Sequence, residues 1–509
     1  MTTPHSQQST SGSQRNSRQR SAHSTAINRR SFLRDAGTIA AGLAASQMVL
    51  PRRSWAAPAP NEAIGLGLIG CGRRGMQLLR AALDKPGVGF SIVCDVNIQR
   101  ATAAAELAAQ LSGVQPAITT DYRDVLDDSQ VHGVFIATPV HWHTSILISA
   151  CAAQKDVYVE VPLALTPIEI TAMAYAVNKY KRVVQVGLQQ RSASAFNEAQ
   201  GIVRSGRLGT IAQTRSWNFT RQSPIARVSD GPVPTDFDYD RWLGPAPERP
   251  FNANRVGRPE HFWDYGSGEA ALWNVQQMDL INMTMRVSVP VSVVAVGGNH
   301  GLKDDRETPD TLDAIFEYAV PSARFTHVYS MRLSNAYAGW GPAALPPANE
   351  SPDAMPLDLP SRSGTQFFGT EKTLFVGGKK LLLLPAEAES PVEDLSYLGI
   401  CSQSSLSPSI ESQPASTPGP RVDSLTIAHV QQFINCIPVR KHPSATIDMG
   451  ELAMFPMIAA TIAYRVGRKL YIEPGKREFY LDAELKTPDQ EANQLLKPKY
   501  RETYQLPNV

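Results

Sequence analysis

The first half of the chain alternates between short apolar runs and amphipathic stretches. Apolar runs at 63–69 and 90–94 are followed by helical patterns at 76–83 and 99–112. The alternation continues with a helical turn at 122–126, a strand at 131–137, a helix at 144–154 and strands at 156–160 and 183–188. Because strands that alternate with helices form parallel sheets covered on both faces, this half is predicted to be a doubly wound α/β domain.

The second half changes character near residue 209. Long runs rich in β-branched and aromatic residues predict strands at 213–219, 291–297, 311–320, 323–333 and 373–384. Helical periodicity returns at 272–286, 424–437 and 450–466. We expect the last two helices to pack towards the edge of the sheet or the first domain. Segments 341–363 and 402–420 are rich in Pro and Ser, which is typical of surface insertions or lids.

The composition fits a chain of two or three folded domains. With 509 residues, of which 42% are hydrophobic and 19% charged, the chain can bury a large core. Five cysteines without a C-x-x-C spacing argue against a disulfide framework. A formal net charge of +2 gives no reason to expect a nucleic-acid partner.

Most of the positive charge lies at the start of the chain. Residues 1–56 hold eight Arg and one acid, a net charge of +7, which leaves −5 for the remainder of a chain whose total is +2. Arg29 and Arg30 precede an apolar run at 36–50, and small residues lie at 54–56. This order is typical of a twin-arginine signal peptide, whereas the alternative is a disordered basic tail.

The signal hypothesis assigns residues 1–56 to a segment that is removed near Ala56. The apolar run is shorter than the roughly 20 residues that span a membrane, so no permanent membrane insertion is expected. The mature protein would then be periplasmic or otherwise in the cell envelope, exported by the twin-arginine route.

A glycine-rich turn joins the first strand to the first helix. The sequence Gly70-Cys71-Gly72-Arg73-Arg74-Gly75 has the spacing G-x-G-x-x-G. Such glycines give a tight turn, a close approach of backbone to pyrophosphate, and close packing of helix on strand. The helix N-terminus then offers free N–H groups to the phosphates. We therefore predict a dinucleotide-binding Rossmann domain, although a plain β–α turn would have similar glycines.

The end of the second strand bears on the choice of cofactor. Asp95 follows Gly75 by 20 residues, where an acid binds the ribose hydroxyls and repels a 2′-phosphate. This favours NAD over NADP. Arg73 and Arg74 keep NADP possible, because an Arg near the ribose accommodates the extra phosphate.

Three stretches together resemble the Gfo/Idh/MocA oxidoreductases. They are GCGRRG at 70–75, ATPVHWH at 137–143 and VYVEVPLALT at 157–166. The resemblance extends through GLQQR at 187–191, RSGRLGTI at 204–211, ETPDT at 307–311, FFGTEKTL at 367–374 and AYRVGRKL at 463–470. It covers about residues 63–506 and is strongest with the exported, sugar-directed branch of the family.

The resemblance implies an architecture and partners. It implies a Rossmann domain at 62–190, then an α+β C-terminal domain at 191–480 with a large open, mainly antiparallel sheet for substrate binding and oligomerisation, and a tail at 481–509. A sugar or polyol would be the substrate, and a homo-oligomer, dimer or tetramer, would form through the open sheet face. Cofactor contacts carried over from the family motifs comprise Thr138, Pro139, His143, Glu160 and Pro162.

The resemblance fails at the residues expected to be catalytic. The family's Lys of E-K-P is replaced by Val161, and its His, three residues before a retained Asp279, is replaced by Gln276. Oxidation of an alcohol needs a group that accepts the hydroxyl proton, and neither valine nor glutamine does so usefully. Nearby candidates for this role are His143, His261 and Asp264, although His261 could equally be a structural histidine. Gln276 and Asp279 would orient the substrate.

The sequence predicts no metal site. His141 and His143 are two residues apart, lack the helical i, i+4 spacing of a zinc-protease motif, and have no third ligand in view. Trp217, Trp242, Trp263 and Trp273 offer aromatic surface for a sugar ring, with core packing the expected role of at least half of them.

Three functional hypotheses follow. The first is an exported NAD(P)-dependent oxidoreductase that transfers hydride between nicotinamide and a sugar or polyol carbon, with non-standard catalytic residues. The second, taken from the family resemblance, is an enzyme that retains NAD and cleaves a glycoside by transient oxidation and elimination. The third is a catalytically degenerate protein that binds nucleotide and carbohydrate.

Overall fold

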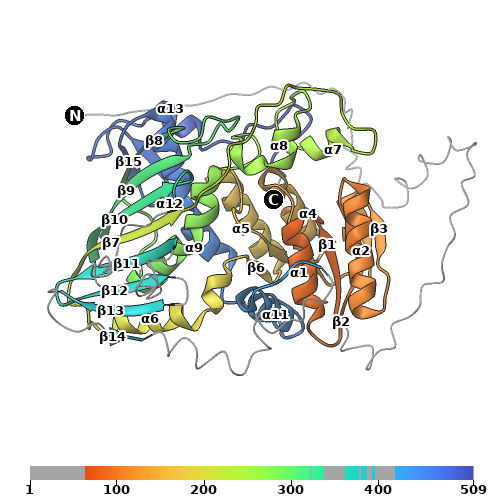
Figure 1. Cartoon of the computed structure of the whole chain (residues 1–509), viewed down its shortest axis with the longest axis horizontal. Coiled ribbons are helices and arrows are strands. Elements are labelled where there is room, and N and C mark those ends of the chain that lie inside the picture. Colours follow the sequence, from red (N-terminus) through yellow and green to blue (C-terminus); the bar gives the residue numbers. More distant parts are fainter. Residues whose placement is uncertain are drawn as a thin grey trace, which may run out of the picture. The chain divides into compact units, whose positions relative to one another are not determined.

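The computed structural model describes residues 64–320, 323–336, 362–377, 380–386, 393–395 and 419–507. The predicted signal peptide at 1–56 lies outside the described residues, and so do almost all of the segments 341–363 and 402–420. Figure 1 shows the described elements, with a ten-stranded sheet at the left and a six-stranded sheet at the right.

The six-stranded sheet belongs to the first domain and is wholly parallel. Its order is β3-β2-β1-β4-β5-β6. The strands are β1 (Ile64–Ile69), β2 (Val88–Cys94), β3 (Ala117–Thr119), β4 (Gly133–Ile136), β5 (Asp156–Val159) and β6 (Val184–Val186). This is the doubly wound Rossmann order, and it reverses between β1 and β4. The crevice at the carboxyl ends of these two strands is therefore the expected binding site.

The helices of the first domain begin and end on local signals. They are α1 (Arg73–Leu83), α2 (Ile98–Ser112), α3 (Tyr122–Asp127), α4 (His143–Ala152) and α5 (Pro167–Tyr180), with short 3₁₀ turns η1 (Val140–Trp142) and η2 (Gln189–Ser192). The Asn97 side chain caps α2 by accepting backbone N–H groups, and Gly113 ends it at φ +73°. Thr166 and Glu169 form a reciprocal capping box at the start of α5, which hydropathy alone did not single out.

One face of the parallel sheet is covered by a helix from the far end of the chain. Helix α11 (Ser424–Val439) packs Val430, Phe433 and Ile434 into the same buried cluster as Phe135 and Tyr158 of the sheet. The rings of Phe433 and Phe135 meet edge to face at 5.6 Å. The core of the first domain is therefore completed by residues more than two hundred positions away, as Figure 1 shows for α11 beside β6 and α1.

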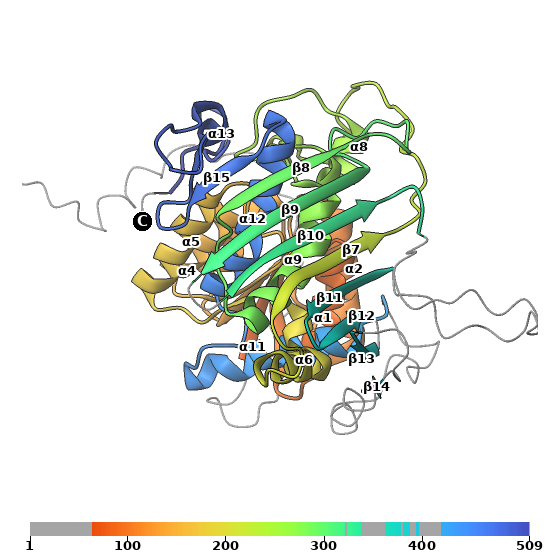
Figure 2. The same cartoon turned by 90° about the vertical axis from the view of Figure 1, so that its left-hand side faces the viewer.

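The ten-stranded sheet forms the second domain and is mostly antiparallel. Its order is β14-β13-β12-β11-β7-β10-β9-β8-β15-β16, and among these pairs only β7 and β10 run parallel. The strands are β7 (Ile211–Phe219), β8 (Ser292–Gly298), β9 (Thr311–Val320), β10 (Ala323–Arg332), β11 (Ser363–Gly369), β12 (Lys372–Gly377), β13 (Lys380–Pro385), β14 (Glu393–Asp394), β15 (Leu470–Glu473) and β16 (Glu478–Tyr480). Figure 2 shows this sheet face on.

The prediction of a single strand at 373–384 is wrong. The chain reverses within it, because Gly377 pairs with Lys380 and β12 pairs with β13 in antiparallel fashion. The Gly-Gly sequence at 377–378 is a hairpin signal that the apolar run concealed.

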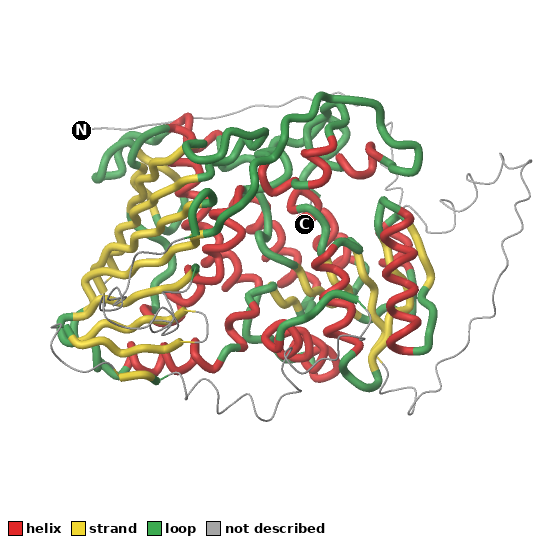
Figure 3. Tube along the Cα trace, in the orientation of Figure 1, coloured by secondary structure: helices red, strands yellow, loops and turns green. Residues whose placement is uncertain are grey.

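Helices fill the space between the two sheets, as Figure 3 shows. The longest are α9 (Gly268–Met285) and α12 (Ile447–Val466), which pack on each other, and α12 also packs on β8 and α5. Helix α12 is long and apolar enough to cross a membrane, but most of it is buried in the protein core. The shorter helices are α6 (Ser194–Arg204), α7 (Tyr239–Leu243), α8 (Ala253–Gly257), α13 (Gln490–Gln494) and the turn η3 (Pro259–His261). The predicted fold class, a Rossmann domain followed by an α+β domain with a mainly antiparallel sheet, is confirmed.

Candidate active site

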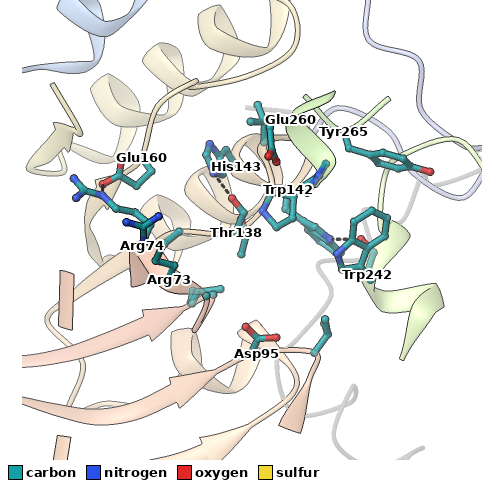
Figure 4. Close-up of a pocket in the computed structure, with 18 of the residues that line it drawn as sticks. Arg73, Arg74, Asp95, Thr138, Trp142, His143, Glu160, Trp242, Glu260 and Tyr265 are labelled. Carbon is teal, nitrogen blue, oxygen red and sulfur yellow. Dashed lines mark hydrogen bonds and ion pairs between the residues drawn. The ribbon is translucent and has the colours of Figure 1, made fainter. Parts of the chain in front are cut away.

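A cavity of about 1000 Å³ opens at the carboxyl ends of the parallel strands and reaches the second domain. Figure 4 shows part of its lining. Eleven of the predicted site residues line it, namely Gly70, Gly72, Arg73, Arg74, Asp95, Thr138, Pro139, His143, Glu160, Pro162 and Gln276. The remaining ones lie outside the described lining, namely Cys71, Gly75, His261, Asp264 and Asp279.

The glycine turn has the geometry that a pyrophosphate needs. Gly70 has φ +94°, and an added Cβ would lie 2.6 Å from the Ala137 carbonyl. At Gly75 an added Cβ would lie 1.9 Å from the Gly70 oxygen, so helix and strand can approach only without a side chain there. At Gly72 an added Cβ meets no described atom within 4 Å, because this position faces the cavity. Each glycine thus serves a separate purpose, and only Gly72 leaves room for a ligand.

The first turn of α1 presents its backbone N–H groups to the cavity. Its N-cap is Gly72, and no side chain of the described residues caps the helix. Uncapped N–H groups and the helix dipole attract an anion. The turn and helix together therefore fit a dinucleotide phosphate.

Asp95 lines the cavity beside the glycine turn and is fixed by backbone donors. Its carboxylate accepts the N–H of Cys71 at 2.8 Å and the N–H of Asn97 at 2.9 Å. Burial raises the pKa of Asp95, while these two hydrogen bonds oppose the rise. A carboxylate has further lone pairs, so it can still accept ribose hydroxyls.

Arg74 points away from Asp95, towards the other end of the cavity (Figure 4). Its Nε donates to Glu160 Oε1 at 2.7 Å, and its Nη1 donates to the Thr426 hydroxyl in the first turn of α11 at 3.2 Å. Burial would lower the pKa of Arg74, but the Glu160 carboxylate raises it, and the guanidinium stays charged. Arg74 therefore has a partner already, which leaves the exposed Arg73 as the motif's cation facing the cavity.

The two histidines of the motif at 137–143 are held by backbone oxygens. His143 places Nδ1 at 2.9 Å from the Pro162 carbonyl and Nε2 at 2.9 Å from the Thr138 carbonyl. Burial lowers the pKa of His143, although both carbonyls oppose this. His141 contacts the Trp242 carbonyl at 2.9 Å, and burial lowers its pKa to about 4. His143 thus joins the two segments that line the nicotinamide end.

Gln276 lines the cavity from α9, and its side-chain amide forms hydrogen bonds within the protein. Its Nε2 donates to the Gly187 carbonyl at 2.8 Å and to Gln189 Oε1 at 3.1 Å, while its Oε1 accepts the Gln190 N–H at 3.4 Å. These bonds fix the turn that follows β6. Gln276 is therefore a positioning residue in this arrangement, and Val161 beside it brings no polar atom.

Three predicted catalytic residues lie behind the described cavity wall. Both oxygens of Asp279 bind Arg191 at 2.6 Å, and burial raises the pKa of Asp279 against the pull of that guanidinium. Asp264 forms an ion pair with Arg249. His261 is buried beside Glu260 and Glu269, and burial lowers its pKa to about 4. None of these three side chains is placed to touch a molecule in the cavity.

A roof that the sequence did not reveal covers the cavity. The segment at 234–260 forms an aromatic cluster that includes Tyr239 and Trp242, and this cluster takes in Val96 of the first domain. Asp236 accepts a hydrogen bond from Gln99 of α2 at 2.8 Å. From the C-terminal segment, Tyr504 packs edge-on against Trp142 at 6.1 Å and lines the cavity. A bound cofactor would therefore be enclosed by residues distant in sequence.

Other lining residues were named from the sequence only in part. Trp273 was named from the sequence as aromatic surface for a sugar ring, and it is 49% exposed, lies three residues before Gln276 on α9, and lines the cavity. Its i, i+3 spacing from Gln276 was the available signal. Glu260, Tyr265 and Trp142 line the cavity as well, and no spacing in the sequence links them to it. Trp217 is fully buried in the sheet core, where it stacks on Phe375.

Family models match both domains. Residues 64–188 match an oxidoreductase family described as an NAD-binding Rossmann fold, Gfo/Idh/MocA. Residues 200–295 match the C-terminal alpha/beta domain of the same oxidoreductase family.

The chain is also similar to individual proteins, either over a short part of its length or at low sequence identity. An alpha-N-acetylgalactosaminidase of Shewanella oneidensis is 32% identical over 158 residues, which is 28% of this chain and 34% of the relative. The match thus spans about a third of that curated relative's length. A levoglucosan dehydrogenase with NADH and levoglucosan has a TM-score of 0.56 at 20% identity, covering 81% of this chain and 100% of the other. The WlbA dehydrogenase of Bordetella pertussis with NADH and UDP-GlcNAcA has a TM-score of 0.57 at 17% identity, covering 82% and 99%. These two structures share the fold.

Proposed function

Because the chain belongs to the Gfo/Idh/MocA oxidoreductase family, we propose that it transfers hydride between nicotinamide and a carbon of a sugar or polyol. The supporting observation is that one cavity runs from the glycine turn to Trp273 and Gln276 on α9. A dinucleotide and a small polar ring therefore have adjoining places in one cavity that is open to solvent. Bound NAD would accept the hydride, and His143 would accept the hydroxyl proton, because it alone of the three proton acceptors named from the sequence lines the described cavity.

The residues of this chain divide that work. Gly72 and the first turn of α1 would bind the pyrophosphate, and Asp95 would accept the ribose hydroxyls. Asp95 repels a 2′-phosphate and Arg74 is paired with Glu160, so we propose NAD as the preferred cofactor over NADP. Thr138, Pro139 and Pro162 line the nicotinamide end, and His143 holds their two segments together. The ring of Trp273 offers a face on which a sugar stacks.

A second candidate is glycoside cleavage with retained NAD, by transient oxidation and elimination. The roof supports it, because residues of the segment 234–260 and Tyr504 line the cavity and would hinder release of a bound cofactor. The similarity to a relative named alpha-N-acetylgalactosaminidase also supports it. The two candidates share the same site and differ in whether reduced cofactor accumulates.

Two assays on purified protein distinguish these functions. Absorbance first shows whether NAD(H) is bound, and the protein is then mixed with sugars, polyols and aryl glycosides. Net NADH formation supports the dehydrogenase, whereas release of the aryl group without net NADH supports retained-cofactor cleavage. Bound NAD without either product would contradict both and support a protein that only binds nucleotide and carbohydrate. The variant Val161→Lys/Gln276→His tests the last reading, since a gain of dehydrogenase activity would mark the native site as degenerate.

We further propose export by the twin-arginine route and assembly through the open face of the ten-stranded sheet. The segment at 1–56 supports export. Val296 of β8 and Ile315 of β9 are 65% and 43% exposed, which supports a covered sheet face in an oligomer. Cell fractionation with Arg29→Lys/Arg30→Lys tests the first proposal, and light scattering of Val296→Asp tests the second.

A further inference from the structure

Three side chains converge on one point at the cavity wall, where Glu260 lines the cavity and His261 and Glu269 lie behind it. Glu260 and His261 come from the turn η3, and Glu269 comes from the first turn of α9. One ligating atom from each lies within 4.8 Å of the other two. His261 Nε2 is 3.7 Å from Glu260 Oε1 and 3.9 Å from Glu269 Oε1.

His261 is buried without a hydrogen bond to account for it. Its side chain is 1% exposed, and Nδ1 has no partner among the residues that the structure describes. Nε2 points at two carboxylates, but 3.7 and 3.9 Å are too long for hydrogen bonds. If Nε2 carries no proton, its lone pair faces those of the two carboxylates. Either tautomer leaves Nε2 without a hydrogen bond, whereas a cation between the three atoms pairs Nε2 and both carboxylates, with the imidazole proton on Nδ1.

The surroundings hold these groups in place. Gln222 donates to Glu269 Oε1 at 2.9 Å, and the indole N–H of Trp273 donates to the other oxygen. The backbone carbonyl of His261 accepts the N–H of Glu307 at 3.0 Å. Such outer hydrogen bonds orient the ligands of metal sites. The neighbouring Arg306 binds both oxygens of Asp304, and its charge, together with that of Arg258, adds to burial in lowering the pKa of His261.

We propose that Glu260, His261 and Glu269 bind a divalent transition-metal cation such as Zn²⁺. Imidazole with carboxylates suits borderline metals better than Mg²⁺ or Ca²⁺. Ligand atoms in a tetrahedral zinc site lie about 3.3 Å apart, given bond lengths of about 2.0–2.1 Å. The separations of 3.7 and 3.9 Å between His261 and the two carboxylates therefore need closure by a few tenths of an ångström, and the two carboxylates, within 4.8 Å of each other, by up to about 1.5 Å. Three protein ligands leave a fourth position, and Glu260 opens it to the cavity.

The place of the cation suggests what the fourth ligand is. Glu269, Trp273 and Gln276 follow one face of α9 at i, i+4 and i+7. At 1.5 Å per residue, Glu269 and Gln276 are about 10 Å apart along the helix. The cation would thus hold a substrate oxygen remote from the reacting carbon, or a water when substrate is absent. This substrate role rests on the proposed function, whereas the metal site does not.

Metal binding by the full-length protein, without cofactor or sugar, tests the site. Protein stripped with a chelator is titrated with Zn²⁺ by calorimetry and with Co²⁺ by visible absorption. We expect one ion per chain and the intense Co²⁺ bands of tetrahedral coordination. Glu260→Gln and His261→Gln should each weaken binding by more than about 100-fold, beyond the usual effect of an outer-shell change.

The exposed Glu248, on the same segment and away from the cluster, gives the matched control Glu248→Gln, which should bind Zn²⁺ like the wild type. Thermal unfolding of the metal-free proteins shows whether each variant folds. Glu260 is the most exposed of the three ligands, so its variant should keep the wild-type melting temperature without metal. Absence of a stoichiometric ion in the wild type, or unchanged affinity in both ligand variants, would overturn the proposal, whatever the protein's activity on sugars.

Discussion

The two walls of the cavity are built by different means. The first-domain wall consists of a glycine turn, a helix N-terminus and strand ends, so backbone groups do most of the binding. The second-domain wall consists of side chains from α9, the roof and the C-terminal segment. Backbone sites impose a fixed residue spacing, whereas side-chain sites are assembled by tertiary packing. The glycine turn of the first wall keeps the family pattern, whereas the pattern is broken once on each wall, at Val161 after β5 and at Gln276 on α9.

The sharpest test of the backbone wall is a pair of glycine variants. Gly72→Val places its side chain in the cavity without touching described atoms, so the protein should fold but bind NAD at least about 100-fold more weakly, or about 2.8 kcal/mol. Gly75→Ala meets the Gly70 oxygen and should lower the melting temperature instead. Calorimetric titration and thermal unfolding separate the two effects. Wild-type NAD affinity in Gly72→Val would show that the phosphates bind elsewhere.

Acid should destabilise the protein through histidines buried on both sides of the cavity. Burial lowers the pKa of His141 to about 4 and that of His327 to about 3. An unfolded histidine titrates near 6.5, so the unfolded chain binds more protons below that pH. Stability contributed by each neutral histidine is thus complete above pH 6.5 and declines as the pH falls towards its folded pKa, by up to about 1.4 kcal/mol per pH unit.

Denaturant unfolding between pH 7 and pH 4.5 measures this slope. Two hydroxyls hold the His327 ring, Thr214 at 2.9 Å and Ser216 at 3.1 Å, so His327→Gln should flatten the slope by about one proton. Replacement of the exposed His442 by Gln is the control. An unchanged slope in His327→Gln would mean that His327 is charged in the folded protein.

Replacement of Asp95, on the first-domain wall, should change cofactor affinity less than the Gly72 variant does. Asp95→Asn keeps one acceptor oxygen but turns an amide N–H towards either the Cys71 or the Asn97 N–H. NAD affinity should fall about tenfold, or about 1.4 kcal/mol, and NADP should lose less because the repelling charge is gone. Fluorescence titration with both reduced cofactors checks the ratio. An equal loss for the two cofactors would contradict a selective role for Asp95.

The features of the first-domain wall could be predicted from the sequence better than those of the second-domain wall. Strand alternation and the motif at 70–75 located the parallel sheet, the phosphate turn and Asp95, because each depends on local spacing. The roof, Tyr504 and the approach of Glu269 to His261 depend on contacts between segments distant in sequence. His143 shows a third case, since a motif placed it in the cavity wall but only the structure shows both ring nitrogens facing carbonyls.

The smallest expected effect lies on the side-chain wall. Gln276→Ala removes the bonds that hold the turn after β6, so kcat for the preferred sugar should fall about threefold to tenfold, in line with loss of one or two hydrogen bonds. The NAD dissociation constant should stay within about twofold, because the phosphate turn is untouched. Steady-state kinetics and NAD titration on one preparation give both values. A larger change in the NAD dissociation constant than in kcat would contradict the assignment of cofactor binding to the first-domain wall alone.

Helix α11 makes the first domain discontinuous, and this has a consequence for biosynthesis. As the ribosome extends the chain, the parallel strands emerge long before Ser424–Val439 arrives to cover Phe135 and Tyr158. Until then the nascent domain would expose an apolar aromatic surface to which chaperones can bind. A fragment ending at residue 190 would keep that surface permanently and should aggregate. We therefore expect cofactor binding to follow synthesis of α11, and the shortest segment expected to bind the cofactor extends from β1 through α11.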